Sequence, residues 1–295
     1  MARSERQALT GTTGVLGVIG DPIAHSLSPA MQNAALEALG LDYIYVPFHV
    51  SPLCVKEAIA GMKALGIRGL NVTIPHKVAV LQYMDEVEPV AGLIGAVNTI
   101  SNEDGCLIGY NTDACGFLIS LRKEADRDVQ GQRVTILGAG GSARAIGFQL
   151  AVSEIEQLVI ANRTRSSAVA LAEEISRKTG CPAAGVGLDE VEAQLPSTDI
   201  LVNTTPLGMH PRIDTMPPVN LRKLPASALV CDIVYNPSET LLLKNAAACG
   251  LQTLPGLGML VYQGAAALEI WLKVSPPTDV MKAAVQRELE NRNGS

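Results

Sequence analysis

The chain has 295 residues, of which 47% are hydrophobic and 18% charged, so it can bury a sizeable core and is long enough for two domains. Lys and Arg number 23 against 29 Asp and Glu, and the net charge of −6 provides no overall attraction to nucleic acid or to an anionic membrane. Only 3% of residues are aromatic, which also argues against a base-stacking surface.

The six cysteines and four histidines are scattered along the chain. Because no cysteine pair has CxxC spacing and none lies beside a histidine at ligand distance, we expect no metal site, and reduced, buried cysteines. The first six residues lack the apolar core of a signal peptide, and the apolar stretch 257–272 is interrupted by Gln263 and Glu269. A cytoplasmic location without membrane contact is therefore expected.

The first part of the chain alternates short β-type runs with helical patterns. Strands are predicted over residues 15–19, 43–47, 69–74 and 95–100, and helices over 31–39, 53–65, 78–84 and 114–121, with residues 107–110 leading into the last of these helices. This order predicts an α/β unit of about 110 residues whose polar side chains gather at strand ends.

Two serines precede the first predicted helix. Ser28 stands directly before Pro29, which is typical of a helix N-cap followed by proline at the first helical position. That role does not explain Ser26. Two hydroxyls at this spacing face the same way if the segment leading into the helix is extended. Together with the free N–H groups of the helix, they would suit a carboxylate.

Residues 71–77, with the sequence NVTIPHK, place an amide, a hydroxyl and an ammonium close together. Asn71 and Thr73 alternate with apolar residues and so share one face of the predicted strand, which Pro75 ends. Lys77 follows. This arrangement suits a cleft for a small polyhydroxylated molecule, and the alternative is a strand cap followed by a surface lysine.

Two further polar residues have both a structural and a functional interpretation. Asn98 lies among apolar residues of a predicted strand, so it needs hydrogen-bond partners, which either the backbone or a ligand could supply. Asp113 stands at the start of a predicted helix, where an acidic side chain is also favourable without any ligand.

The composition changes after the polar stretch 125–132, which is interpreted as a hinge between domains. A buried strand is predicted over 134–137, followed by GAGGSA at 138–143 and a helix over 144–152. This is the G-x-G-x-x-A form of the dinucleotide-binding fingerprint between a strand and a helix. Its glycines allow a tight turn and close approach of a pyrophosphate to the helix N-terminus.

The next predicted strand, 158–161, ends at residues 162–165, NRTR. A cofactor with a free ribose 2′-hydroxyl would favour an acidic residue near this strand end, and none is present. Two arginines and a threonine instead suit a 2′-phosphate, because guanidinium groups pair with phosphate through two hydrogen bonds. The sequence thus favours NADP over NAD, and the alternative is that Arg163 and Arg165 are ordinary solvated charges.

The remaining predicted elements complete a second α/β domain. Helices are expected over 166–178 and 239–248, and strands over 199–203 and 229–234, while residues 252–254 precede the glycines at 256 and 258. The last two helices, 259–272 and 279–291, are expected to fold back onto the first domain. We therefore predict a discontinuous substrate-binding domain of residues 1–122 plus about 259–295, a doubly wound Rossmann-type domain of residues 123–258, and a cleft between them.

With these residues in place, the chain resembles the shikimate dehydrogenase family nearly from end to end. The motifs that carry the resemblance, in order, are HSLSP at 25–29, NVTIPHK at 71–77, GAVNT at 95–99, GYNTD at 109–113, GAGGSA at 138–143, NRT at 162–164, DIVY at 232–235 and GMLVYQ at 258–263. The resemblance implies reversible, NADPH-dependent reduction of 3-dehydroshikimate to shikimate, a step toward chorismate and the aromatic amino acids. A homodimer is one assembly to consider, and the ligands are small molecules.

The resemblance also implies a role for individual positions. Lys77 and Asp113 match the catalytic pair. The matched substrate-binding positions are Ser26, Ser28, Asn71, Thr73, Asn98, Asp113, Tyr235 and Gln263. The matched cofactor-binding positions are Gly138, Ala139, Gly140, Gly141, Ser142, Asn162, Arg163, Thr164, Arg165, Ile233 and Gly256. In one departure, Ser167 stands where the family often has an arginine for the 2′-phosphate, so Arg165 would have to substitute.

Three alternatives remain open at this point. A quinate dehydrogenase using NAD would share most of these motifs, although the two serines and the arginines favour shikimate and NADP. A non-catalytic regulator that keeps the ligand pocket should lack Lys77 or Asp113, and both are present. A Rossmann-fold enzyme of another pathway, such as a methylene-folate dehydrogenase, would explain residues 138–143 but not Ser26, Ser28, Asp113 and Gln263 together.

Overall fold

The structure is a computed structural model that describes residues 9–293, so the N-terminal segment assessed for a signal peptide lies outside the described residues. The chain divides into two compact units: unit 1 comprises Met1–Thr112 and Gln263–Ser295, and unit 2 comprises Asp113–Tyr262. Both boundaries between the units fall within helices, one in α4 (Thr112–Glu124) and the other in α8 (Leu257–Leu272). The boundaries expected from the sequence lie inside the same two helices.

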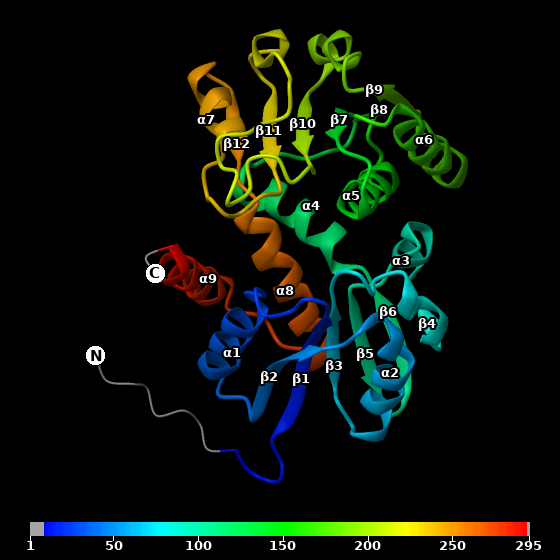
Figure 1. Cartoon of the computed structure of the whole chain (residues 1–295), viewed down its shortest axis with the longest axis vertical. Helices are drawn as coiled ribbons and strands as arrows, with labels where there is room; N and C mark the ends of the chain where they lie inside the picture. Colours follow the sequence, from blue (N-terminus) through cyan, green and yellow to red (C-terminus); the bar gives the residue numbers. More distant parts are fainter. Residues whose placement is uncertain (1–8, 294–295) are drawn as a thin grey trace. The chain divides into compact units, whose positions relative to one another are not determined.

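Unit 1 is built on a six-stranded mixed sheet (Figure 1). Strand β1 pairs in parallel with β2 and β3, β5 is antiparallel to both β3 and β6, and β4 is parallel to β6. In spatial order the strands are β2 (Tyr43–His49), β1 (Gly14–Gly20), β3 (Gly69–Val72), β5 (Thr99–Glu103), β6 (Cys106–Tyr110) and β4 (Glu86–Val87).

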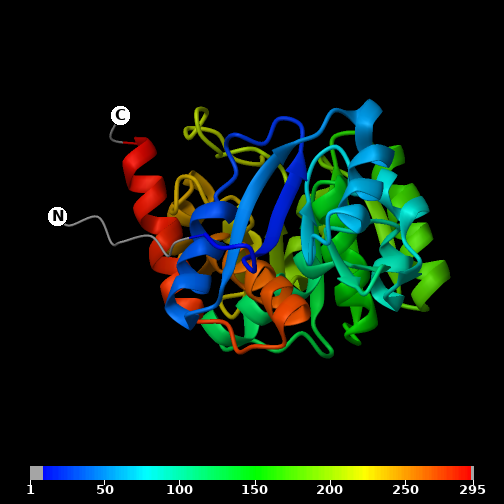
Figure 2. The same ribbon diagram turned by 90° about the horizontal axis from the view of Figure 1, so that it is seen from below.

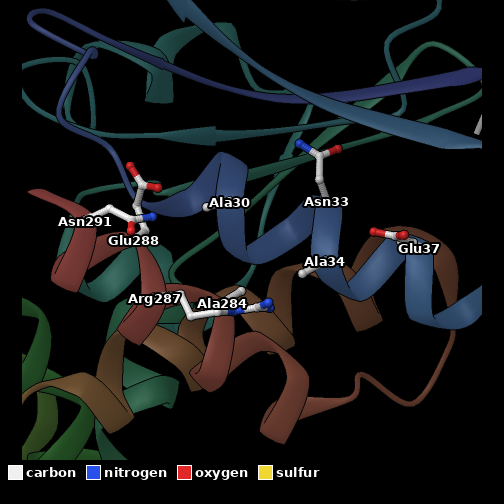
Figure 3. Close-up of a pocket in the computed structure, with 8 residues that line it drawn as sticks. All are labelled: Ala30, Asn33, Ala34, Glu37, Ala284, Arg287, Glu288 and Asn291. Carbon is white, nitrogen blue, oxygen red and sulfur yellow. The ribbon is translucent and has the colours of Figure 1, made fainter. Parts of the chain in front are cut away.

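The helices of unit 1 cover this sheet. Helices α1 and α9 lie side by side (Figures 1 and 2), and an open pocket between them is lined by small and polar side chains of both (Figure 3). The bounds are α1 (Ser28–Leu39), α2 (Val55–Ala64), α3 (Pro89–Ile94) and α9 (Thr278–Asn293), with 3-10 turns η1 (Pro52–Cys54) and η2 (Ala79–Tyr83).

Trp271 of α8 anchors that helix to the sheet of unit 1. Its side chain is 1% exposed, and its Nε1 donates a hydrogen bond to the carbonyl of Ile100 at 2.9 Å. A Cβ at Gly69 would lie 2.3 Å from Trp271 Nε1, so the strand can pass beneath the indole only because residue 69 is glycine.

Unit 2 contains a six-stranded, fully parallel sheet with helices α5 (Gly141–Val152), α6 (Arg165–Thr179) and α7 (Leu241–Ala248), together with α4. Most of these strands are apolar runs buried along their length, as parallel strands require. In spatial order they are β12 (Gln252–Leu254), β11 (Leu229–Asp232), β10 (Ile200–Asn203), β7 (Arg133–Leu137), β8 (Gln157–Asn162) and β9 (Ala183–Gly187). Short 3-10 turns are η3 (Val191–Ala193), η4 (Leu195–Ser197) and η5 (Leu221–Lys223).

The strand order of unit 2 reverses between β10 and β7. From β7 the chain adds β8 and then β9 on one side, and from β10 it adds β11 and then β12 on the other. Such a switch point, at the carboxyl ends of the central strands, is where doubly wound sheets bind nucleotides. The fold class expected from the sequence, α/β with a Rossmann-type second part, is confirmed.

Several local expectations were wrong. Residues 95–100 are not one strand: Gly95, at φ 72°, ends α3, and β5 begins only at Thr99. The segment predicted as a helix over 78–84 forms the 3-10 turn η2. Ser28 is the first residue of α1 and not its N-cap, which is Leu27. Strands β4 and β9 were not predicted, because one has two residues and the other consists of alanine, glycine and valine.

Candidate active site

Polar side chains of unit 1 meet at one edge of its sheet, where β3 and β6 end and β5 begins. The register brings Asn71 opposite Thr99 and Thr99 opposite Tyr110. Asn71 is 6% exposed and Asn98 3% exposed. The folding of three strands to a common edge thus brings together two candidate substrate residues that lie 27 positions apart in the chain.

Asn98 has backbone and side-chain partners, as its burial requires. Its Oδ1 accepts a hydrogen bond from the backbone N–H of Thr112 at 2.7 Å, and its Nδ2 donates to Thr112 Oγ1 at 3.1 Å. Thr112 begins α4, so Asn98 also satisfies one of the free N–H groups at the start of that helix.

The two serines lie at the start of α1, and both are half-buried. Ser26 Oγ accepts a hydrogen bond from the backbone N–H of Ser28 at 3.3 Å, so the two side chains belong to one local turn. Arg292, near the end of α9, donates to the carbonyl of His25 at 2.7 Å and to that of Ser26 at 3.4 Å. The C-terminal helix thereby holds the loop that carries both hydroxyls.

The segment 73–77 is a loop whose backbone is fixed on both sides. Thr73 N–H donates to Ile19 O at 3.0 Å, and Val97 N–H donates to Lys77 O at 2.8 Å. The buried ring of His76 hydrogen-bonds the carbonyl of Val50 at 2.7 Å. His76 therefore has a structural role in the loop, and it positions the half-buried Thr73 and Lys77 on either side.

The remaining candidate residues are divided between the units. Gln263 is a buried residue of α8 in unit 1, whereas Asp113, in the first turn of α4, and the half-buried Tyr235 belong to unit 2. The pairing of Asp113 with Lys77 stays a prediction.

The glycine-rich turn lies at the switch point of unit 2, directly after β7. Gly138 has φ 110°, a conformation that favours glycine, and an added Cβ would lie 2.6 Å from Thr204 Oγ1. Gly140 and Gly141 differ, because an added Cβ at either would meet nothing within 4 Å. The fold itself has no need of glycine there, whereas a pyrophosphate against the N-terminus of α5 would need the space. The residues therefore fit a dinucleotide.

The loop after β8 carries the candidate 2′-phosphate residues. Asn162 Nδ2 donates to the carbonyl of Thr164 at 3.1 Å, which shapes the turn. Arg163, Thr164 and Arg165 are exposed. Arg165 Nε lies 3.1 Å from Glu190 Oε2, so its guanidinium already has an acidic partner.

Ile233 and Gly256 lie next to one another after β11 and β12. A Cβ at Gly256 would come within 2.3 Å of the Ile233 carbonyl oxygen, so residue 256 must be glycine for the two loops to approach. Ala139 and Ser142 belong to the glycine-rich turn and are half-buried. All the candidate cofactor residues thus lie at or after the carboxyl ends of strands in one parallel sheet.

Two hydrogen-bonded clusters of unit 2 each contain a carboxyl group with a shifted pKa. Burial raises the pKa of Asp232 to about 6, against the effect of hydrogen bonds from Thr240, Val234 N–H and Asn203. Arg144 of α5 makes two hydrogen bonds to Glu174 of α6, at 2.6 and 2.7 Å. Arg144, with Lys178, lowers the pKa of Glu174 to about 2.

Within residues 9–293, no three His, Cys, Asp or Glu side chains are grouped so that they could hold a metal ion. Over the same residues, no helix has both the length and the apolar composition needed to cross a bilayer.

Family models cover most of the chain. The model described as the shikimate dehydrogenase substrate binding domain matches residues 18–100, that of shikimate / quinate 5-dehydrogenase matches 120–233, and that of the shikimate 5′-dehydrogenase C-terminal domain matches 256–286. The chain is also 48% identical over 281 residues to the shikimate dehydrogenase (NADP(+)) of Methanothermobacter thermautotrophicus, covering 95% of this chain and 99% of that protein.

The chain belongs to the shikimate dehydrogenase family. Solved structures agree. A crystal structure of a shikimate dehydrogenase in complex with NADP+ matches with a TM-score of 0.89 and 47% identity, covering 96% of this chain and 98% of that one. A shikimate 5-dehydrogenase from Listeria monocytogenes in complex with shikimate and NAD matches with a TM-score of 0.89 and 40% identity, covering 94% and 98%.

Sequence reasoning missed three residues of this shikimate dehydrogenase family member. Tyr45, Thr99 and Thr112 are buried and hydrogen-bonded to candidate substrate residues. For Tyr45 a signal existed: a tyrosine within a predicted strand core has a hydroxyl that needs a partner. The two threonines carried no comparable signal, because a strand favours threonine for its shape alone.

Proposed function

We infer that this protein is an NADP-dependent shikimate dehydrogenase, an oxidoreductase that reversibly reduces 3-dehydroshikimate to shikimate on the route to chorismate and the aromatic amino acids. The observation that carries the inference is the pair of buried amides, Asn71 and Asn98, at one sheet edge in the part of the chain that matches the family's substrate binding domain. Buried amides suit ring hydroxyls, because a hydroxyl can donate to an amide oxygen or accept from an amide nitrogen.

The two units have separate tasks in this proposal. Unit 1 holds the substrate: Ser26 and Ser28, together with Tyr235 from unit 2, bind the carboxylate. The ring hydroxyls are bound by Asn71, Thr73, Asn98, Asp113 and Gln263. Unit 2 holds the cofactor on the glycine-rich turn at residues 138–142 and on the loop at 162–165. The open space beside Gly140 and Gly141 supports this assignment.

Lys77 is proposed as the proton carrier. When bound, NADPH supplies the hydride, which leaves negative charge on the carbonyl oxygen. The Lys77 ammonium donates a proton to that oxygen and stabilises the developing charge. A neighbouring carboxylate favours the charged form of a lysine, so Asp113 is proposed to keep Lys77 protonated for reduction. In the oxidative direction Lys77 must act as a base, so oxidation should become faster as the pH rises.

An assay of initial rates tests the proposal. Reduction of each cofactor is followed at 340 nm with shikimate and with quinate, each with NADP+ and with NAD+. We expect the highest kcat/KM for shikimate with NADP+. A preference for quinate with NAD+ would overturn the choice of substrate, and ligand binding without turnover would favour a regulator.

The cellular setting follows from the same proposal. All six cysteines, each within the described residues, are free thiols, which suits a reducing, cytoplasmic compartment. A homodimer stays a prediction, and sedimentation velocity at several protein concentrations tests it.

A further inference from the structure

Five polar side chains of unit 1 form one continuous hydrogen-bond network beneath the sheet edge. Two of them, Asn71 and Asn98, are proposed substrate residues. The other three have no assigned role in the reaction: Tyr45, Thr99 and Thr112. All five are buried, with exposures from 0% to 6%. Because buried polar groups have few alternative partners, the direction of each hydrogen bond can be followed from fixed donors and acceptors.

The orientation of the Asn71 amide is fixed by a backbone carbonyl. Its Nδ2 lies 3.3 Å from the carbonyl oxygen of Asn98 and 3.0 Å from Thr99 Oγ1. A carbonyl oxygen can only accept, so the nitrogen of Asn71 must face it. The opposite amide orientation would place two oxygens against each other. Asn71 Oδ1 therefore faces the other way, toward Tyr45.

The hydroxyl of Tyr45 donates to Asn71 Oδ1 at 2.7 Å. Burial raises the pKa of Tyr45, so the phenol stays protonated and keeps the hydrogen it donates. Tyr45 is thus the hydrogen-bond donor to an asparagine proposed to bind a ring hydroxyl.

Tyr45 is also held rigidly. Its ring is 1% exposed and lies 6.2 Å, centroid to centroid, from the ring of Trp271 at an interplanar angle of 39°. Its backbone is held by Asn33 of α1, whose Oδ1 accepts from Tyr45 N–H at 2.9 Å and whose Nδ2 donates to Tyr45 O at 2.8 Å. In Figure 3 the Asn33 amide points away from the pocket between α1 and α9. The donor therefore has one well-defined position.

These contacts leave Asn71 with a single kind of hydrogen bond for a ligand. Two protein acceptors lie within reach of the two hydrogens of its Nδ2, and Tyr45 occupies one of the two acceptor sites of its Oδ1. What remains is the second acceptor site. We propose that Tyr45 is a positioning residue that, together with the Asn98 carbonyl, holds Asn71 as an acceptor, so that this subsite selects a ligand hydroxyl able to donate a hydrogen. The proposal rests on the proposed function for the identity of that ligand.

Tyr45→Phe tests this proposal, because phenylalanine keeps the ring packing and removes only the hydroxyl. Tyr43→Phe is the matched control: Tyr43 lies on the same strand, and its hydroxyl makes no hydrogen bond within residues 9–293. We expect Tyr45→Phe to raise the KM for shikimate about tenfold, the usual effect of one hydrogen bond, with kcat within about twofold and the KM for NADP+ unchanged. Tyr43→Phe should resemble the wild type.

Fluorinated ligands give a readout that a merely structural role would not move. Fluorine replaces a non-reacting ring hydroxyl of shikimate with a group that cannot donate, and competition against shikimate gives its inhibition constant. Two analogues are compared, each with fluorine in place of one of the two non-reacting ring hydroxyls. The wild type should bind one of them much more weakly than the other, and Tyr45→Phe should lose most of that difference. An unchanged ratio of inhibition constants, or a lower melting temperature without any change in KM, would overturn the proposal.

Two further measurements cover the remaining outcomes. If Tyr45→Phe does not fold, Thr99→Val removes the acceptor on the other side of Asn71 and should cause the same loss of discrimination. If the wild type does not oxidise shikimate, the proposed function fails, but the orientation of Asn71 can still be measured without ligand. Its side-chain amide NMR signals, identified by their loss in Asn71→Ala, should be protected from solvent exchange in the wild type and less protected in Tyr45→Phe. Equal protection would contradict the inference.

Discussion

Arg165 forms an ion pair with Glu190, with Nε 3.1 Å from Oε2, whereas Arg163, two positions earlier in the same loop, has no ion-pair partner within residues 9–293. Both side chains are exposed, so the pair contributes little to stability. The ion pair does change what each arginine can offer a ligand. Arg165 would have to leave or share the Glu190 carboxylate in order to bind a phosphate, whereas Arg163 would not.

We therefore expect Arg163→Ala to raise the KM for NADP+ by about 10- to 100-fold, the worth of a charge-assisted hydrogen bond, and to leave the KM for NAD+ nearly unchanged. Arg165→Ala should have a smaller effect on the KM for NADP+. Initial rates with both cofactors at saturating shikimate provide the measurement. The larger loss in Arg165→Ala would show that the ion pair opens for the cofactor.

Lys77→Ala should lower kcat by roughly 10²- to 10⁴-fold, the usual contribution of a general acid or base, with little change in the affinity for NADP+. Single-turnover rates separate this chemical step from product release. Lys56→Ala, at an exposed position of α2, serves as the control and should leave kcat unchanged. Near-wild-type turnover without the Lys77 amine would rule it out as the proton carrier.

Asp232 should make the protein less stable as the pH rises from about 4 to 6. Its pKa is raised to about 6 in the folded state, so the folded protein holds the proton more tightly than the unfolded chain over this interval. A shift of this size corresponds to about 3 kcal/mol of unfolding free energy. Asp232→Asn cannot ionise, so its stability relative to the wild type should increase over the same interval.

Urea unfolding at pH 4, 5, 6 and 7 measures this difference. Asp214→Asn, at an exposed position of unit 2, is the control and should show a difference that is independent of pH. A constant difference for Asp232→Asn as well would mean that the carboxyl is already ionised throughout.

The contact of Arg144 with Glu174 should have the opposite dependence on pH. The pKa of Glu174 is lowered to about 2, so its stabilisation is present above its ordinary value near 4.5 and is lost as the pH falls toward 2. We expect Glu174→Gln to lower the unfolding free energy by about 1 kcal/mol at pH 7 and by less at pH 3.5. The neighbouring Glu173→Gln, at an exposed position, should have little effect at either pH.

The parts of the fold that follow from local pattern could be predicted. The buried run before the glycine-rich turn, and the strand at Ile200–Asn203, are indicated by apolar residues bounded by polar or turn residues. The error at residues 95–100 arose because Gly95 was interpreted as part of an apolar strand. In the structure its left-handed conformation ends α3, a short helix for which six residues carry little periodic signal.

The candidate site could be predicted only as a set of residue types. Asn98 was expected to need partners, but its partner, the Thr112 backbone N–H, lies 14 positions away and depends on how β5 and β6 pair. The same holds for Tyr45 and Asn71, which are 26 positions apart. Sequence spacing indicates which face of a strand a side chain occupies, whereas the direction of a hydrogen bond depends on strands brought together by the tertiary fold.

Trp271, which packs over Gly69 and donates to the Ile100 carbonyl, is the single tryptophan of the chain. Its emission therefore reports on unit 1 alone, without a competing indole in unit 2. Because its ring is buried beside Tyr45, loosening of the substrate-binding half should shift the fluorescence maximum to longer wavelength even while the nucleotide-binding half stays folded. The native chain thus carries an intrinsic optical probe for following the two halves separately during denaturation.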